Sequence, residues 1–438
     1  MHKAILALVL LPALSALPAF AQPSQGPPAG PGAPGGRAAR PPVEIDRTPP
    51  VEDFKPSALN QPGRQYPEVN SQRRVRTRFV APQAQLVQLD IGGVRYPMTK
   101  GADGAWIGVS NAQDEGFHYY QLNVDGVSVP DPGTRMFYGS SRWGSGVEVP
   151  AQDADFYAVK NVPHGQLREV HFFSKTANAT LKCYVYTPPE YEKGSKRYPV
   201  LYLQHGGGED EHGWGGQGYT GFIMDNLLAA GKAKPFIIVI GNSSIPGAAG
   251  GRGGARGAAA GPGPVPAGAP GAGAGRGQVP AGAPGAAGRG PGAPGGRGFM
   301  TFTAFENVLI NDMIPYIDAN FRTIAKQTHR AMSGLSMGGM QTKSITLAHL
   351  DKFSHIGIFS GGNIAMTDIK DLADFKKKVK LVFVSYGSRE NGATGKTNVE
   401  ALKQAGINSV FYESPQTAHE WLSWRRSLYQ FAPLLFQE

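Results

Sequence analysis

Residues 334–338 read Gly-Leu-Ser-Met-Gly, and this stretch decides how the second half of the chain is interpreted. Residues 328–333 before it have the character of a short strand, and residues 339–345 after it that of a helix. A Gly-x-Ser-x-Gly sequence between a strand and a helix forms a sharp turn that exposes the serine hydroxyl. Glycines beside the serine let neighbouring backbone pass without a clash. We therefore expect Ser336 to be a nucleophile.

A nucleophilic serine needs a general base and a group that orients that base. His419 follows the last predicted strand, residues 409–413, and is the candidate base. In α/β-hydrolases the chain order is serine, acid, histidine, so the acid should follow the strand predicted over residues 380–386. Glu390 lies in the loop after that strand and is the candidate acid, with Asp368 and Asp371 as alternatives.

A glycine-rich sequence, His205-Gly206-Gly207-Gly208, directly follows the buried strand predicted over residues 200–204. In this position it matches the motif whose backbone N–H groups stabilise an oxyanion. We expect the donors to be Gly207 and Met337, with Gly206 and Gly208 as alternatives to Gly207. Two tryptophans near these loops, Trp214 and Trp421, are predicted to bind substrate, whereas Trp424 is expected to pack in the core.

Strands and helices alternate from about residue 165 onward, which predicts an α/β fold with a mostly parallel sheet flanked by helices. The expected helices include a long amphipathic one over residues 304–321. Residues 71–150 have a different pattern, because short apolar runs are separated by turn signals such as Asp103-Gly104 and Asp125-Gly126. This spacing predicts a small β-sandwich domain that precedes the α/β domain.

The ends and gaps of these domains have distinctive compositions. Residues 1–21 combine a charged start, an apolar stretch and a small-x-small ending at Ala21, which predicts a cleaved signal peptide and a periplasmic or secreted protein. Residues 22–70 are expected to be a disordered Pro/Gly-rich leader and connector. Residues 246–298 are an insertion rich in Gly, Ala and Pro, and cannot bury enough apolar surface to fold.

Composition argues against several classes of function. Cys183 is the single cysteine, so neither a disulfide within the chain nor a thiolate metal cluster can form. Half of the net charge of +10 comes from five arginines of the 246–298 insertion, and the run 73–78 is interpreted as a strand with exposed charges. We therefore expect no nucleic-acid partner and no membrane association. No cofactor and no metal are expected either, because the spacing of His205, Glu209, Asp210 and His212 matches no ligand signature.

Three stretches of the α/β region, residues 198–208, 334–339 and 419–425, resemble the esterase D-like carbohydrate esterases. That group includes feruloyl and acetyl-xylan esterases and relatives of enterochelin esterase. The resemblance covers about residues 160–438. It implies an α/β-hydrolase fold with Ser336 as nucleophile, His419 as base, Glu390 at the acid position and main-chain donors at Gly207 and Met337. A glutamate stands where aspartate is common, and the 246–298 insertion is outside the family pattern.

The preceding region, residues 71–150, is similar to the immunoglobulin-like or carbohydrate-binding E-set domains found fused to such esterases, which implies a glycan contact. Together the resemblances imply a secreted serine carboxylic ester hydrolase, acting on feruloyl or acetyl esters of plant cell-wall polysaccharide. A siderophore esterase or an acyltransferase is the alternative enzyme. A carbohydrate-binding protein with an inactive hydrolase domain is the alternative of another class.

Overall fold

The computed structural model of the protein describes residues 43–246 and 302–437. The expected signal peptide, nearly all of the leader over residues 22–43 and nearly all of the 246–298 insertion lie outside these ranges. The elements below all belong to one compact unit, Ile45–Glu438.

Within the two described ranges, none of the helices has the length and hydrophobicity needed to cross a bilayer.

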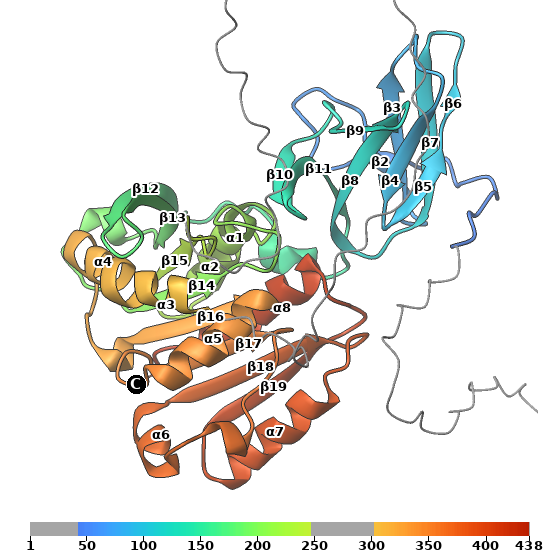
Figure 1. The fold of residues 1–438 in the computed structure, drawn as a ribbon. Coiled ribbons are helices and arrows are strands. Elements are labelled where there is room, and N and C mark those ends of the chain that lie inside the picture. The colour runs from blue at the N-terminus through green and yellow to red at the C-terminus, as the bar shows by residue number, and fades with distance from the viewer. Residues whose placement is uncertain (1–42, 247–301, 438) are drawn as a thin grey trace, which may run out of the picture. The chain divides into compact units, whose positions relative to one another are not determined.

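A mostly parallel sheet of eight strands forms the centre of the C-terminal region (Figure 1). Its order is β12-β13-β15-β14-β16-β17-β18-β19, and only the β12–β13 and β13–β15 pairs are antiparallel. The sheet agrees with the sequence prediction. Its strands are β12 (Gln166–Ser174), β13 (Ala179–Thr187), β14 (Val200–Gln204), β15 (Ile237–Gly241), β16 (Arg330–Leu335), β17 (His355–Phe359), β18 (Leu381–Gly387) and β19 (Ser409–Ser414).

Helices cover both faces of this sheet. Alternate side chains of a strand point to opposite sides, and in the buried strands both sets are apolar and need a covering layer. In β14, Leu201 and Leu203 pack with apolar residues of α2 (Thr220–Ala229) and α8 (Trp421–Phe431). Val200 and Tyr202 instead pack with helices of the other face. That face carries α3 (Thr303–Val308), α4 (Ile314–Asn320), α5 (Met337–Ala348), α6 (Leu372–Lys378) and α7 (Ala393–Gln404).

Two helical segments differ from the sequence prediction. The helix expected over residues 304–321 is divided into α3 and α4 by a π-helical turn, Leu309–Met313. Pro315 lies in the first turn of α4 and has no N–H to donate, which accounts for a local change of helical hydrogen bonding. Helix α6 was not predicted, because its sequence is mostly charged. It is capped by the Asp371 side chain, which accepts from the N–H of Asp374, and it buries Phe375.

The N-terminal strands form two antiparallel sheets, with the orders β1-β2-β3-β7-β6 and β10-β11-β8-β4-β5, and β9 pairs with β8. Val75 and Trp106 from the first sheet share one apolar cluster with Leu89, Leu122 and Val147 from the second. The strands are β1 (Lys55–Pro56), β2 (Glu68–Val69), β3 (Arg74–Val80), β4 (Val87–Ile91), β5 (Val94–Pro97), β6 (Thr99–Lys100), β7 (Ala105–Ala112), β8 (Gly116–Val124), β9 (Val127–Val129), β10 (Met136–Gly139) and β11 (Arg142–Val149).

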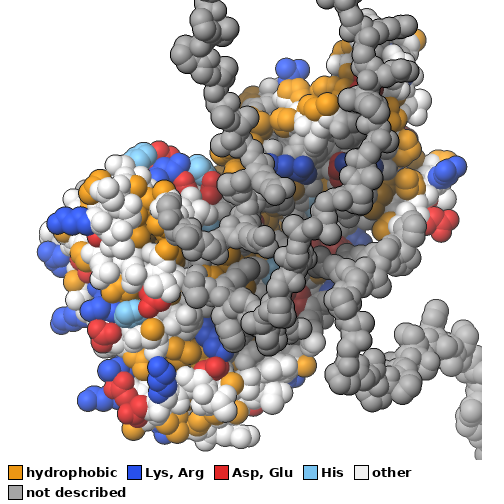
Figure 2. Space-filling model, viewed as in Figure 1, with side chains coloured by type: hydrophobic (Ala, Val, Ile, Leu, Met, Phe, Trp, Pro, Cys, Tyr) orange, Lys and Arg blue, Asp and Glu red, His pale blue; other side chains and the backbone are white. Residues whose placement is uncertain are grey.

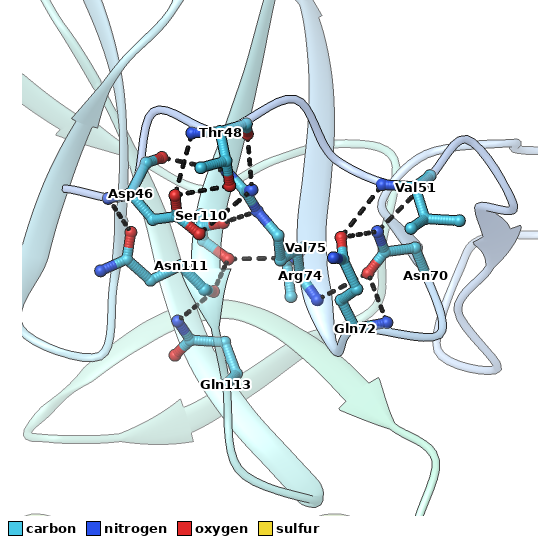
Figure 3. Close-up of polar contacts among 10 residues, drawn as sticks. All are labelled: Asp46, Thr48, Val51, Asn70, Gln72, Arg74, Val75, Ser110, Asn111 and Gln113. Atoms are coloured by element: carbon cyan, nitrogen blue, oxygen red, sulfur yellow. Dashed lines mark hydrogen bonds and ion pairs between the residues drawn. The ribbon is translucent and has the colours of Figure 1, made fainter.

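The segment 45–70 is ordered, which corrects the expectation of a disordered connector there. β2 pairs with β3, and Leu59 is fully buried. Figure 3 shows how this segment is fixed: Arg74 donates to the carbonyls of Thr48 and Ser110, both at 2.9 Å. Burial of a guanidinium is tolerated because its donors find acceptors.

The basic run 73–78 is therefore only partly the exposed strand that we expected. Arg74 is 4% exposed. Arg76 pairs with Glu52 and Glu68, and Arg78 pairs with Asp103. On the face shown in Figure 2, Lys and Arg side chains are interspersed with Asp and Glu. A basic residue count in sequence thus overstates the free positive charge of this strand.

A buried ion pair joins the N-terminal strands to the last helix. Arg425 of α8 is completely buried and contacts Glu148 of β11, with Nη1 to Oε1 at 2.6 Å and Nη2 to Oε2 at 3.1 Å. The guanidinium carbon lies 4.6 Å from the ring centre of Tyr157 and 4.3 Å from that of Tyr219. A bidentate pair with aromatic neighbours fixes both partners in direction as well as distance.

Candidate active site

Ser336 occupies the sharp turn between β16 and α5, with φ of 52° and ψ of −115°. Such a conformation is unfavourable for a residue with a side chain and persists only where its surroundings impose it. The glycines on either side of Ser336 let neighbouring backbone approach closely enough to impose this conformation. A Cβ on Gly338 would lie 2.6 Å from the carbonyl oxygen of His205, and one on Gly334 would lie 2.5 Å from the carbonyl carbon of Gly338. The turn is therefore packed so closely that side chains are excluded at both positions.

The three residues expected to form a catalytic triad lie within hydrogen-bonding distance of one another. His419 Nε2 is 2.9 Å from Ser336 Oγ, and His419 Nδ1 is 2.7 Å from Glu390 Oε1. All three follow parallel strands at the same edge of the sheet: β16 leads to Ser336, β18 to Glu390 and β19 to His419, with β17 between β16 and β18. With its Nδ1 proton directed at the carboxylate, the imidazole presents Nε2 as an acceptor for the serine hydroxyl.

Glu390 is held by further donors that the sequence did not indicate. Its Oε2 accepts from the hydroxyl of Ser360 at 2.6 Å and from the N–H of Gly387 at 2.7 Å. Burial alone would raise the pKa of Glu390, but the hydrogen bonds from His419, Ser360 and Gly387 outweigh it, so the pKa is lowered. The carboxylate therefore stays ionised beside the imidazole.

Trp424 completes this support. Its indole N–H donates to Ser360 Oγ at 3.2 Å, and its ring packs edge-on against the His419 ring with centres 5.1 Å apart. Trp424 was expected to be a core residue, and it is indeed buried.

The alternative acids have other partners. Asp368 pairs with Lys343 at 2.6 Å and accepts from the N–H of Ala365. Asp371 caps α6. The structure thus brings Glu390, rather than either aspartate, to His419.

The glycine loop, defined here as residues 205–209, lies beside the serine turn. A Cβ on Gly207 would lie 4.0 Å from the Met337 side chain. Within the described ranges, the N–H groups of Gly207 and Met337 donate to no protein acceptor, whereas that of Gly206 donates to Glu209 Oε2 at 3.3 Å. Of the alternative donors, Gly206 is therefore engaged. Met337 also begins a helix, whose N-terminus favours negative charge.

The expected role of the two tryptophans requires correction. Trp214 is fully buried, and its N–H donates to the carbonyl of Gln204 at 2.9 Å. Trp421 is 2% exposed and packs edge-on against Trp214. Neither offers the surface that a substrate would need, because both fill the core beneath the glycine loop.

Three potential metal ligands, Asp210, Glu211 and His212, have ligand atoms within 4.8 Å of one another. Lys182 Nζ lies 3.0 Å from Glu211 and so supplies a positive charge to this group. We assign no ion to it. His205 anchors the loop instead, since its Nδ1 contacts the carbonyl of Gly206 and its Nε2 accepts from the N–H of Ser243. Burial lowers the pKa of His205, which keeps the ring neutral.

Two further polar residues lie near the loop: Glu209, which we weighed above only as a metal ligand, and Tyr119, which we did not consider. Glu209 accepts a hydrogen bond from the hydroxyl of Tyr119 of β8 at 3.3 Å. Glu209 directly follows the glycine motif, so its position was a usable signal. Nothing in the sequence links it to Tyr119.

Parts of this chain are similar to known proteins. A family model described as "Putative esterase" matches residues 174–244 and 295–434. An endo-1,4-beta-xylanase/feruloyl esterase of Xylanibacter ruminicola is 41% identical over 402 residues, which are 90% of this chain and 49% of that protein. Endo-1,4-beta-xylanase Y of Acetivibrio thermocellus is 22% identical over 293 residues, which are 60% of this chain and 22% of that protein. The chain thus spans about half the length of the first relative and about a fifth of the second.

Among solved structures, the enterobactin esterase of Shigella flexneri aligns with a TM-score of 0.52 at 13% identity, over 83% of this chain and 93% of that one. At this identity the likeness concerns the fold, which is of the α/β-hydrolase type. The family match and the identity to the first relative agree: residues 174–244 and 295–434 of this chain are similar to the esterase family that the model describes.

Proposed function

We propose that this protein is a serine carboxylic ester hydrolase with a Ser336–His419–Glu390 triad. The proposal depends mainly on one observation, the two hydrogen bonds of His419 to Ser336 at 2.9 Å and to Glu390 at 2.7 Å. The strained backbone at Ser336 supports it, since conformations of this kind persist at functional sites.

The proposed reaction has two stages. Ser336 Oγ attacks the ester carbonyl carbon while its proton passes to His419 Nε2, and the N–H groups of Gly207 and Met337 stabilise the oxyanion. His419 then gives the proton to the departing alkoxide, which leaves an acyl group on Ser336. Water, activated by the same imidazole, releases the acid and restores the serine. Glu390 holds the imidazole and stabilises its positive charge without taking the proton.

We propose feruloyl or acetyl esters of plant cell-wall polysaccharide as the substrates. The name of the first relative, which combines a xylanase with a feruloyl esterase, supports this class. The His419 side chain is 49% exposed, which suits an ester on a bulky polymer. The chain covers only about half of that relative, so its substrate class remains a proposal.

An ester panel tests this function. The purified protein is assayed on methyl ferulate, acetylated xylan and a catechol-siderophore lactone, and a fluorophosphonate probe is mapped by mass spectrometry. We expect turnover of one of the first two esters and an adduct on Ser336. Preference for the lactone would favour the siderophore alternative. A chain that binds xylan, yet neither reacts with the probe nor turns over an ester, would be the carbohydrate-binding alternative.

We also propose that the two N-terminal sheets form an immunoglobulin-like β-sandwich that contacts glycan, and that the chain is exported after cleavage near Ala21. The shared apolar cluster of the two sheets supports the first part. Co-sedimentation with insoluble xylan tests the glycan contact, with loss of the protein from the supernatant as the expected result. N-terminal sequencing of the mature protein tests the cleavage.

A further inference from the structure

Glu209 is a carboxyl group beside the active site that the triad does not use. It directly follows the three glycines of the glycine loop. A Cβ placed on Gly206 would lie 3.5 Å from Glu209 Oε2 and 3.5 Å from Ser336 Cβ. The Glu209 carboxyl group and the Ser336 side chain therefore both lie next to Gly206.

The contacts of Glu209 close the loop on itself. Oε2 accepts from the N–H of Gly206 at 3.3 Å, and the N–H of Glu209 donates to the carbonyl oxygen of Gly206, also at 3.3 Å. Gly206 is thus bound on both of its backbone polar groups. Among the described residues, the N–H groups of Gly207 and Gly208 both donate to no protein acceptor, and Gly207 is the one beside Met337, since a Cβ on it would lie 4.0 Å from the Met337 side chain.

Tyr119 of β8 holds the other carboxyl oxygen, Oε1, from the N-terminal region. The hydroxyl has one proton to donate, and the competing acceptor, the carbonyl of Tyr138, already receives the Gln217 amide at 2.8 Å. The Tyr119 oxygen in turn accepts from Gln217 at 2.6 Å and from the Trp421 indole at 3.3 Å. The hydroxyl lies 3.3 Å from Glu209 Oε1 and 3.4 Å from the Tyr138 carbonyl, and a carboxylate is the stronger acceptor of the two.

A second contact from the N-terminal strands reaches the same loop. The N–H of Ser141, in the turn between β10 and β11, donates to the carbonyl of Gly208 at 2.7 Å. Gly208 has φ of +79°, and a Cβ on it would lie 3.3 Å from Ser140 Cα. The glycine loop is therefore held at Gly206 through Glu209 and at Gly208 through this turn.

We propose that Glu209 is a positioning residue that, together with Tyr119, fixes the glycine loop so that the N–H of Gly207 faces the reacting carbonyl. The inference rests on the proposed function. It makes the N-terminal strands part of the esterase site, independently of any glycan that they bind. Preorganised donors are effective only when they already point to where the oxyanion forms.

The charge of Glu209 gives this role a signature in the pH profile. Burial raises the pKa of Glu209 to about 7, while the hydrogen bonds from Gly206 and Tyr119 lower it and the charge of Asp210 raises it. Tyr119 and Asp210 are the titratable groups that face it, and α1 (Gly213–Gly216) and α8 face it with the uncharged Gly213 and Trp421. Below this pKa the carboxyl is neutral. Above it, a negative charge beside Ser336 opposes the oxyanion, so the rate should fall as pH rises.

The test compares Glu209→Ala, Glu209→Gln and Tyr119→Phe on a chromogenic acetate ester across pH 5–9. The matched control is Tyr120→Phe, because the Tyr120 hydroxyl also binds a carboxyl group, Asp131 at 2.7 Å, but inside the N-terminal strands. Thermal unfolding and fluorophosphonate labelling of Ser336 confirm that each variant is folded and has a reactive serine.

We expect Glu209→Ala and Tyr119→Phe to lower kcat by roughly 10- to 100-fold with little change in KM, less than the loss of a whole oxyanion donor. Glu209→Gln keeps an oxygen for Gly206 but cannot ionise, so it should recover most of kcat at low pH and lose the alkaline decline. Tyr119→Phe removes a hydrogen bond to the charged form and should move that decline to higher pH. Tyr120→Phe should change neither kcat nor the profile.

The outcomes separate the two proposals. If the wild-type serine does not react with the probe and no ester is hydrolysed, the proposed function is wrong. If the wild type is active and either Glu209→Ala or Tyr119→Phe keeps the wild-type kcat, as Tyr120→Phe should, the positioning role is overturned. Should Glu209→Ala fail to fold, Tyr119→Phe still decides.

Discussion

The serine turn and the glycine loop lie side by side but are fixed in different ways. The turn at residues 334–338 is held by backbone contacts with two strands of the central sheet: Gly338 packs against the end of β14, and the N–H of Ser336 donates to the carbonyl of Phe359 in β17 at 2.8 Å. The glycine loop is held by side chains and backbone from far along the chain, including Tyr119 and Ser141. One half of the site is thus held by the central sheet, and the other depends on the N-terminal strands.

This contrast suggests a division of labour in the proposed reaction. The nucleophile needs a rigid presentation that no neighbouring region should disturb. The oxyanion donors depend on a supported loop, and their support makes them sensitive to how the N-terminal strands are packed. Substitutions near the turn should therefore affect the chemistry directly, whereas substitutions in distant strands should act through the glycine loop.

The largest expected effect comes from the serine turn. Ser336→Ala removes the proposed nucleophile and should lower kcat by about 10⁶-fold, as for other serine hydrolases. Ser344→Ala is the matched control, because Ser344 lies on the exposed side of the same helix, α5. Steady-state hydrolysis of a chromogenic acetate checks both variants. Near-normal turnover by Ser336→Ala would show that the serine turn does not present the nucleophile.

The next largest effect should come from the acid. Glu390→Gln keeps the shape of the side chain but no longer orients or stabilises the imidazolium, and we expect kcat to fall by about 10⁴-fold. Glu413→Gln, at an exposed position of β19, is the control. If Asp368→Asn or Asp371→Asn reduces the rate more than Glu390→Gln, another carboxylate orients His419 during the reaction.

The ion pair between α8 and β11 tests the dependence on the N-terminal strands. Arg425→Met leaves Glu148 buried and unpaired, and should lower the free energy of unfolding by about 3–5 kcal/mol. Arg78→Met breaks an exposed pair with Asp103 and should cost no more than about 1 kcal/mol. Denaturant titration measures both. The double variant Arg425→Met, Glu148→Leu should be more stable than Arg425→Met alone, and the opposite order would argue against an unpaired charge as the cause.

The smallest expected effect comes from backbone strain in the glycine loop, compared with the same strain at a turn away from the site. Gly208→Ala forces a side chain into a left-handed conformation and should cost about 1–2 kcal/mol. Gly93→Ala imposes the same strain at φ of +77° with no atom within 4 Å of its Cβ, away from the site. Both should lose similar stability, and Gly208→Ala alone should lower kcat. Equal kcat values would show that the loop tolerates displacement.

The sequence predicted the serine turn well because its determinants are adjacent residues. Ser336, Gly334 and Gly338 form a pattern that predicts a strand–turn–helix. The serine–acid–histidine order of α/β-hydrolases then predicted Glu390 and His419. The eight-stranded sheet followed from alternating strand and helix patterns. In each case the information lay within about ten residues or in the order of elements.

The supports of the site were not predicted, because they depend on contacts between distant residues. Ser360 and Trp424 reach Glu390 and His419 from separate elements, and Tyr119 reaches Glu209 across 90 residues. Trp214 was misjudged for the same reason. A tryptophan near a loop suggested a substrate contact, but its N–H bonds to the carbonyl of Gln204 inside the core.

Cys183 gives the molecule a practical property. It is the single thiol of the chain, is completely buried in β13, and its pKa is raised by burial to about 12. A maleimide dye should therefore leave the folded protein unlabelled. One cysteine introduced on the surface would then be the sole attachment point for a fluorophore or spin label, and distances could be followed during turnover without first removing a native thiol.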